Sequence, residues 1–397
     1  MWIDRQIKDR VNQSVRSRPA VLLTGARQTG KSTLLQRMFP ETTYITFDYL
    51  QQVEAAREAP EQFLSRFDAP VIFDEIQYVP ELFRELKIVI DKHRNDYGRW
   101  IMTGSQQFSL MGQVSESLAG RIALLRLETL SAMELRQARI FDPDRFLYRG
   151  GYPELWANKN LSLEDFFESY VRTYVERDLK TIIDVKNLSD FRRFFRIAAT
   201  RTGQLLNYRS LAADVGISDV TIKKWIHALE ISGLIYLLPP FYANIGKRLV
   251  KSPKLYFGDH GLLCHLLGID SAAQWHDHPH KGSLWENLVM MELIKTLHLH
   301  PGTDLFFYRD QNGVEIDFII EKKDRLILVE AKAGERVASE KLAFSRVAPL
   351  LGARYAAVRN LLALNMPGND ILTRKHFACF NPMHVDAADA AESQSPG

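Results

Sequence analysis

The sequence predicts an α/β fold that begins with a parallel sheet and continues into a helical module and a second α/β domain. Apolar runs at residues 20–24, 44–47, 70–73 and 100–103 predict buried strands, and amphipathic patterns between them predict helices. Strands that alternate with helices favour a parallel, doubly wound sheet. Because strand and helix patterns appear again after about residue 275, we expect a second α/β domain in the C-terminal part.

A glycine-rich segment between the first predicted strand and the following helix indicates a polyphosphate-binding loop. It reads G-x-x-x-x-G-K-S, and the strand before it and the helix after it are the context that a P-loop requires. Backbone N–H groups of such a loop surround phosphates, and the helix N-terminus adds a favourable dipole. We expect Lys31 to reach the β- and γ-phosphates and the Ser32 hydroxyl to bind Mg²⁺. The sequence thus predicts a P-loop NTPase domain that binds ATP through Gly25, Ala26, Arg27, Gln28, Thr29, Gly30, Lys31, Ser32 and Thr33.

Two carboxylates follow the predicted strand at residues 70–73. In P-loop enzymes an aspartate at this place supports Mg²⁺, and an adjacent glutamate can orient and activate the attacking water. We therefore assign Asp74 to the metal and Glu75 to the water.

The strand at residues 100–103 ends in small polar residues. Ligands of open α/β sheets bind at the carboxyl ends of the strands, so Ser105 or Gln106 could contact the γ-phosphate or the attacking water. The same Thr-Gly-Ser tripeptide equally fits an ordinary loop, and the local pattern leaves both interpretations open.

Arg121 stands between a predicted helix at residues 108–118 and a predicted strand at residues 120–127. One interpretation is an arginine finger, which would be supplied to the nucleotide of a neighbouring subunit in a homo-oligomer. The alternative is an exposed arginine in a turn.

Length and composition set limits on the class of protein. A chain of 397 residues is too long for one ordinary core, so two or three domains are expected. No apolar run approaches the roughly 18 to 20 residues needed to cross a bilayer, and the N-terminus lacks the apolar core of a signal peptide. The two cysteines lie far apart, which argues against a disulfide framework. We expect a cytoplasmic protein with no membrane contact.

Residues 208–230 resemble a helix-turn-helix, with two predicted helices joined by a glycine turn. A predicted strand at residues 233–238 and a wing tip at residues 244–248 would complete a winged helix. The segment 186–254 carries 12 Lys and Arg against 4 Asp and Glu, which is the charge of a nucleic-acid-binding element. Packing or subunit contact is the alternative use of such a module. If it binds DNA, we expect phosphate contacts from Lys223, Lys224, Lys247 and Arg248, with Lys251 and Lys254 beside the wing.

A second group of candidate catalytic residues lies near the C-terminus. Asp317 on one predicted strand and Glu330-x-Lys332 on the next match the spacing of the PD-(D/E)XK nuclease core, and Glu286 lies on the preceding helix. Asp317 and Glu330 could hold Mg²⁺ together, and Lys332 could activate water or stabilise developing charge. Degenerate copies of such a core serve as DNA-binding or structural modules, so cleavage stays an open question.

Taken together, these blocks resemble a family of bacterial and archaeal AAA+-type ATPases related to the STAND and origin-recognition-like branch. Members pair an N-terminal P-loop domain with a C-terminal domain of unknown function. The resemblance implies ATP and Mg²⁺ as ligands, and it implies sensor and finger roles for Ser105 and Arg121. The residues that carry it are 24–33, 73–77, 103–105, 117–121, 149–154, 174–179, 285–287, 315–318 and 330–332.

The expected protein is a DNA-associated, AAA+-like ATPase. Two alternatives stay open: a metal-dependent DNA endonuclease that ATP licenses, and a nucleotide switch that binds a protein partner without DNA. The expected parts are an AAA+-like domain (1–145), a helical lid or linker (146–200), a winged helix (201–270), a PD-(D/E)XK-like domain (271–383) and a disordered tail (384–397).

Overall fold

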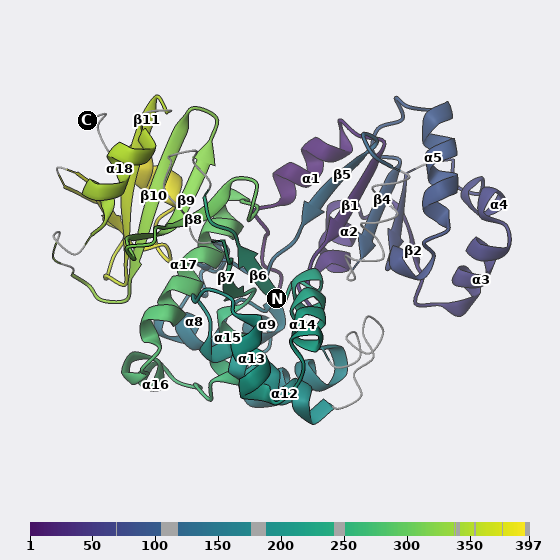
Figure 1. The fold of residues 1–397 in the computed structure, drawn as a ribbon. Coiled ribbons are helices and arrows are strands. Elements are labelled where there is room, and N and C mark those ends of the chain that lie inside the picture. Colours follow the sequence, from purple (N-terminus) through teal and green to yellow (C-terminus); the bar gives the residue numbers. More distant parts are fainter. Residues whose placement is uncertain are drawn as a thin grey trace.

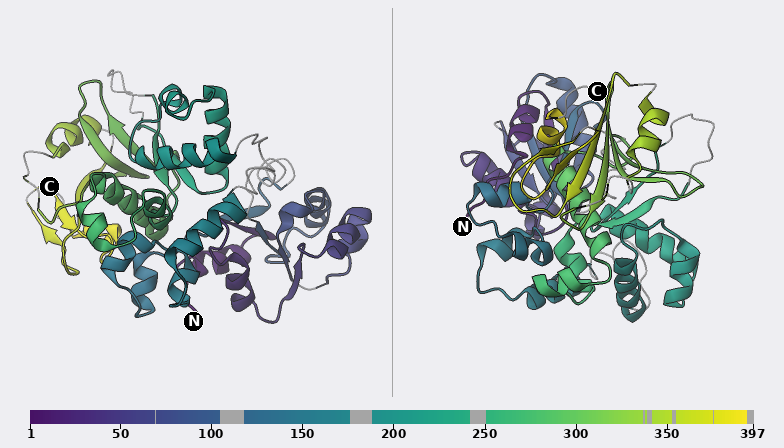
Figure 2. Two further views of the ribbon diagram at one scale, coloured as in Figure 1. Left: turned by 90° about the horizontal axis from the view of Figure 1, so that it is seen from below. Right: turned by 90° about the vertical axis from the view of Figure 1, so that its left-hand side faces the viewer.

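The computed structural model describes residues 1–68, 70–104, 118–175, 188–241, 251–336, 338, 342–352, 355–374 and 376–393. The N-terminal and C-terminal sheets lie on opposite sides of the molecule, and helices from the middle of the chain lie between and beneath them (Figure 1). A view turned by 90° shows the same separation of the two sheets (Figure 2).

The N-terminal sheet is parallel, with five strands in the order β2-β3-β4-β1-β5. Both of its faces are covered, which explains why its strands appear in the sequence as nearly continuous apolar runs. On β1, Val21 and Leu23 pack towards α1 and α2, while Ala20 and Leu22 pack towards α3, α4 and α5. The helix that precedes β1 is α1, which begins at Lys8. The elements are α1 (Lys8–Val15), β1 (Ala20–Thr24), α2 (Lys31–Met38), β2 (Thr43–Thr46), α3 (Leu50–Glu58), α4 (Pro60–Leu64), β3 (Val71–Asp74), η1 (Ile76–Tyr78), α5 (Leu82–Lys92), β4 (Trp100–Gly104) and β5 (Ile122–Arg126).

The middle of the chain is mostly helical and shares one large apolar core with α17 of the C-terminal part. The two helices expected at residues 208–230 are present as α13 and α14, and a short antiparallel pair, β6 and β7, follows them. The elements are α7 (Ala132–Gln137), α8 (Pro143–Arg149), α9 (Pro153–Ala157), α10 (Leu163–Tyr170), the π-helical turn η2 (Val171–Val175), α12 (Leu188–Thr200), α13 (Tyr208–Val215), α14 (Asp219–Ile231), β6 (Ile235–Leu238), β7 (Lys254–Phe257), α15 (His260–Leu266) and α16 (Ala272–Asp277).

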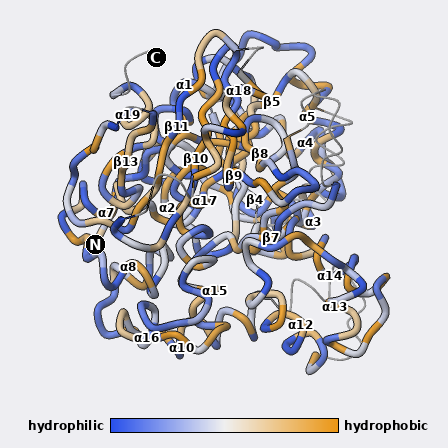
Figure 3. The backbone as a smooth tube through the Cα atoms, turned by 60° about the vertical axis from the view of Figure 1, so that its left-hand side comes forward, coloured by the Kyte–Doolittle hydropathy of each residue, from blue (hydrophilic) through white to orange (hydrophobic). Residues whose placement is uncertain are grey.

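The C-terminal sheet has the strand order β12-β13-β11-β10-β9-β8. Strands β8, β9 and β10 are antiparallel neighbours, and β11 runs parallel to β10 after the crossover helix α18. Helices α17 and α19 pack on one face and α18 packs on the other. Figure 3 shows hydrophobic residues along β9, β10 and β11, between these layers. The elements are α17 (Lys281–Leu297), β8 (Leu305–Arg309), β9 (Glu315–Lys322), β10 (Arg325–Lys332), α18 (Phe344–Gly352), β11 (Ala357–Leu364), β12 (Leu372–Thr373), β13 (Ala378–Phe380) and α19 (Ala387–Glu392).

The tail expected to be disordered from residue 384 instead contains the helix α19. The Asp386 side chain caps its first turn by accepting from the Ala388 N–H group. Ala387, Ala390 and Ala391 are buried against the C-terminal core. Their spacing of three and four places them on one helical face, and small side chains allow this face to pack closely. In the part of the chain that the structure describes, no helix has the length and apolar character needed to span a membrane.

Glu292 on α17 ties the C-terminal part of the chain to the N-terminal part. Its Oε2 atom accepts a hydrogen bond of 2.9 Å from the Ala132 N–H group at the start of α7. The Lys295 ammonium lies 3.5 Å from its Oε1 atom. Only 1% of Glu292 is exposed. Burial raises the pKa of its carboxyl group to about 7, although Lys295 and the Ala132 N–H group oppose the shift.

We expect the free energy of unfolding to fall as pH rises from about 4.5 to about 7 because of Glu292. The folded protein binds the Glu292 proton more tightly than the unfolded chain does, so deprotonation favours unfolding. The loss is on the order of 3 kcal/mol, and Glu292→Gln should remove it. Urea unfolding at pH 5 and pH 8 measures the effect, with Glu154→Gln at an exposed position as the control. A Glu292→Gln protein that loses as much stability as the wild type over this interval would contradict the assignment.

Candidate functional site

The glycines of the loop between β1 and α2 have backbone conformations that side chains rarely adopt. Gly25 has φ of 145° and Gly30, directly before α2, has φ of 92°. A Cβ atom at Gly25 would lie 2.2 Å from the Leu127 carbonyl oxygen, so the loop rests against the segment that follows β5. Because α2 begins at Lys31, the N–H groups of its first turn lie at the loop, where they favour an anion.

Lys31 brings a positive charge into this loop. Its side chain is buried with 5% exposure, and its ammonium donates to the carbonyl oxygens of Gly25 and Ala26 at 3.0 and 2.9 Å. A cation within a curved backbone segment and beside a helix N-terminus is an arrangement suited to polyphosphate.

Asp74 is the centre of the hydrogen bonds at the carboxyl ends of the strands. Its carboxylate is buried with 4% exposure. Hydroxyl groups of Ser32 and Tyr44 donate to it at 2.6 Å each, and the Thr103 hydroxyl donates as well. These side chains come from α2, β2 and β4, so Asp74 connects the loop helix to both neighbours of β3.

The oxygen atoms of Ser32 and Asp74 form a donor set that suits Mg²⁺, which prefers carboxylate and hydroxyl oxygens close to phosphates. The sequence predicted both residues, and the structure brings them into direct contact.

Glu75 follows in a left-handed conformation, with φ of 56°. This conformation costs a non-glycine residue on the order of 1–2 kcal/mol, and strain of this kind often marks functional sites. The Glu75 N–H group donates to the Thr103 hydroxyl at 3.2 Å, and the Gln77 side-chain amide donates to the Glu75 carboxylate. Glu75 is therefore held directly beside Asp74 at the carboxyl end of β3.

Two residues of this network, Thr103 and Tyr44, were absent from the sequence-based site. Thr103 is fully buried and joins Asp74 to Glu75. The expected sensor, Ser105, lies outside the described residues. A polar residue at the end of the neighbouring strand was the available signal for Thr103. Tyr44 lies on β2, and burial together with its bond to Asp74 raises the pKa of its phenol.

Arg121 lies at the amino ends of the parallel strands, whereas the loop lies at their carboxyl ends. It directly precedes β5, whose first residue, Ile122, pairs with Ala20 at the start of β1. The five residues of β1 therefore separate Arg121 from the loop by about 15 Å. Its guanidinium forms a two-point ion pair with Asp91, at 2.7 and 2.9 Å, which raises the pKa of Arg121 and lowers that of Asp91. This position is unsuited to contact with the nucleotide of the same chain.

The basic residues expected to contact DNA have different surroundings. Lys223 and Lys224 are exposed on α14, with the Lys223 ammonium 3.8 Å from the Asp219 carboxylate. Lys247 and Arg248 lie outside the described residues. The expectation for Lys254 is wrong, because this side chain is only 2% exposed and is held among carboxylates.

The turn after α14 lies against the loop between β1 and α2. A Cβ atom at Gly233 would lie 2.7 Å from the Arg126 guanidinium and 3.6 Å from the Ala26 backbone nitrogen. The Arg126 guanidinium also lies over the Tyr236 ring, 4.5 Å from its centroid, and 2.8 Å from the Glu128 carboxylate. The turn that follows α14 therefore lies close to the candidate phosphate-binding loop.

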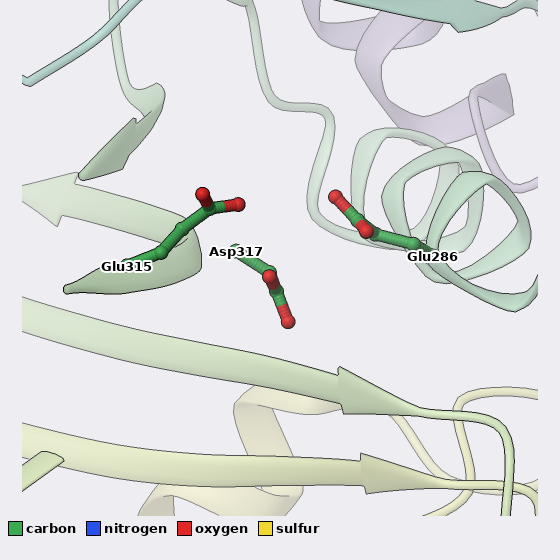
Figure 4. A group of neighbouring side chains, drawn as sticks. All are labelled: Glu286, Glu315 and Asp317. Carbon is green, nitrogen blue, oxygen red and sulfur yellow. The ribbon is translucent and has the colours of Figure 1, made fainter. Parts of the chain in front are cut away.

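The C-terminal candidates also come together. The Lys332 ammonium lies 3.2 Å from the Asp317 carboxylate and 3.3 Å from that of Glu330. Glu286 on α17 faces Asp317 and Glu315 on β9 (Figure 4), and carboxylate atoms of these three residues lie within 4.8 Å of one another. The sequence-based site omitted Glu315. Burial raises the pKa of Glu286 while Lys254 opposes the shift.

Three family descriptions match this chain. Residues 17–136 match an AAA domain, residues 140–273 match a domain of unknown function (DUF8612), and residues 281–367 match another domain of unknown function (DUF4143).

Similar proteins occur in Mycobacterium tuberculosis and Haemophilus influenzae. The uncharacterized protein Rv2008c of Mycobacterium tuberculosis is 33% identical over 356 residues, which cover 89% of this chain and 79% of that protein. An uncharacterized protein of Haemophilus influenzae is 23% identical over 341 residues, covering 78% of this chain and 81% of that protein. Among solved structures, the Walker-type ATPase PABY2304 of Pyrococcus abyssi is similar over 67% of this chain and 96% of that chain, with 16% identity and a TM-score of 0.40.

Proposed function

We propose that this chain binds ATP and hydrolyses it with Mg²⁺, because it belongs to the same family as the uncharacterized protein Rv2008c of Mycobacterium tuberculosis and carries an AAA-type P-loop domain. One observation carries the proposal: the Ser32 hydroxyl donates to the buried Asp74 carboxylate beside the loop that encloses Lys31. This arrangement offers a polyphosphate both a cation and an oxygen donor set for Mg²⁺.

Each residue of the site has a distinct task in this proposal. Lys31 binds the β- and γ-phosphate oxygens and neutralises charge that develops on them. Glu75 orients the attacking water and accepts its proton. Thr103 holds Asp74 and Glu75 in register, since it bonds to both. When bound, Mg²⁺ would neutralise negative charge on the phosphates, and Ser32 and Asp74 would hold it.

We further propose that the ATPase acts in association with DNA. The proximity of the Gly233 turn to the loop supports this proposal, because it places the end of α14 beside the site where phosphate would bind. Residues 186–254 carry 12 Lys and Arg against 4 Asp and Glu, and Lys223 and Lys224 are exposed on α14. Phosphate contact at α14 would thus be transmitted to the loop through the Gly233 turn.

We expect duplex DNA at about 50 mM salt to stimulate ATP hydrolysis, because charge contacts are strongest at low salt. Lys224→Glu should lose the stimulation and keep the basal rate, since the side chain is exposed and points away from the core. Lys159→Glu, an exposed position outside the module, is the matched control. The measurement is steady-state phosphate release with and without DNA.

A basal rate that DNA leaves unchanged in all three proteins would refute the DNA proposal and leave the ATPase proposal in place. In that case a nucleotide switch with a protein partner becomes the better hypothesis. Absence of Mg²⁺-dependent hydrolysis in every condition would refute the ATPase itself.

A further inference from the structure

The C-terminal acidic cluster includes Asp317 and Glu286, two carboxylates that the nuclease-like hypothesis assigns, together with Glu330, to a site for a divalent cation. We define this cluster as Glu286, Glu315 and Asp317. Hard divalent cations need several carboxylate oxygens that are free to coordinate them. The surroundings of these three carboxylates therefore decide whether the cluster fits a metal.

Lys254 occupies the cluster. It comes from β7, the strand that pairs with β6 after the helix-turn-helix segment. Its ammonium lies 2.9 Å from Glu286 Oε1 and 4.0 Å from Asp317 Oδ1, and it is also in direct contact with the Glu315 carboxylate. One buried ammonium thus contacts all three carboxylates. Burial by itself would lower the pKa of Lys254, but the three carboxylates oppose this effect and raise it above the usual value.

Further donors engage the same carboxylates. Asp317 Oδ2 accepts from the Ala331 N–H group at 2.8 Å and from Lys332 at 3.2 Å. Glu315 Oε2 accepts from Arg309 at 2.8 Å, and the Tyr256 hydroxyl donates to Glu286.

Glu330, the other expected metal ligand, is engaged in the same way. Its Oε1 accepts from the Ala343 N–H group, and its Oε2 lies 3.3 Å from Lys332. Three cations of the chain, Lys254, Lys332 and Arg309, thus lie against these four carboxylates.

We propose that the Lys254 ammonium takes the place of a divalent cation, so that the acidic cluster is an ion-paired joint between β7 and the C-terminal domain. A metal that entered would have to displace Lys254. An unpaired ammonium would then remain buried, which is strongly unfavourable. The nuclease-like domain accordingly cleaves no phosphodiester bond, and its carboxylates hold the helix-turn-helix segment in place.

Other contacts at this junction agree with a structural joint. The Phe241 N–H group donates to the Phe307 carbonyl oxygen at 2.7 Å, and the Phe307 N–H group donates to the Pro239 carbonyl oxygen. Lys254 also lies 5.6 Å from the centroid of the Phe307 ring. Backbone hydrogen bonds thus attach the chain after β6 to β8, close to the ion pairs that Lys254 forms with α17 and β9.

Mn²⁺ titration of the nucleotide-free full-length protein, followed by electron paramagnetic resonance, tests the proposal. Wild type and Asp317→Asn should titrate identically, because the cluster takes no metal. Lys254→Met keeps an unbranched stem without its charge, and it should gain a Mn²⁺ site that is lost again in Lys254→Met/Asp317→Asn. Lys251→Met, at an exposed position nearby, should gain none.

Two outcomes would overturn the proposal. One is a Mn²⁺ site in the wild type that disappears in Asp317→Asn, and the other is a folded Lys254→Met protein with no gain in Mn²⁺ binding. The comparison of wild type with Asp317→Asn decides the matter even where Lys254→Met fails to fold. Both readouts are independent of ATP hydrolysis, so they separate this proposal from the one for the P-loop.

Discussion

Replacing Lys31 with alanine is expected to slow ATP hydrolysis by on the order of 10³-fold and to weaken ATP binding. The Lys31 ammonium is buried and lies within the loop, bonded to the carbonyl oxygens of Gly25 and Ala26. Alanine removes the cation that would neutralise the β- and γ-phosphates. It also removes the donor that these two carbonyl oxygens share, so the loop loses an internal contact as well.

The measurements are phosphate release under saturating ATP and equilibrium binding of a fluorescent ATP analogue. Circular dichroism establishes that the variant is folded. Lys92→Ala, at an exposed position on α5, controls for the loss of a lysine from the same domain. Hydrolysis by Lys31→Ala at the wild-type rate would place the active site elsewhere in the chain.

Glu75→Gln is expected to reduce hydrolysis by roughly 10²- to 10⁴-fold while ATP binding is retained. The amide has the same shape as the carboxylate but cannot accept a proton from the attacking water. The backbone bond from Glu75 to Thr103 does not depend on the side chain, so the network around Asp74 should persist. Binding and turnover should therefore separate in this variant, whereas Lys31→Ala impairs both.

Single-turnover hydrolysis and equilibrium ATP binding, measured on the same preparation, give the two quantities. Glu61→Gln, exposed on α4, serves as the matched control. A variant in which binding and hydrolysis decline together would indicate that Glu75 shapes the loop rather than activates water.

Local sequence patterns predicted most of the elements. The strands expected at residues 20–24, 44–47, 70–73 and 100–103 correspond to β1, β2, β3 and β4, because apolar runs and flanking turn residues mark such segments clearly. The same reason made three site residues predictable. Asp74 directly follows an apolar strand, and Lys31 and Ser32 follow the loop after such a strand.

Contacts that depend on strand order were not predictable from local patterns. Thr103 and Tyr44 meet Asp74 because β3 lies between β2 and β4, an arrangement that no local pattern records. The environment of Lys254 was missed for a related reason: the net charge of a segment says nothing about the direction of each side chain. Its partners Glu286 and Glu315 lie 32 and 61 residues further along the chain.

The placement of Arg121 has a consequence for symmetry. This arginine and the P-loop lie at opposite ends of the strands of one parallel sheet. If Arg121 serves the nucleotide of a neighbouring subunit, the contact joins the Arg121 end of one sheet to the P-loop end of another. The two surfaces in contact are then different. A head-to-tail contact of this kind closes into a ring or continues as a helical filament, and all its subunits would face the same way. In a two-fold dimer, by contrast, the contact would have to form twice across one axis, with each subunit both giving and receiving an arginine.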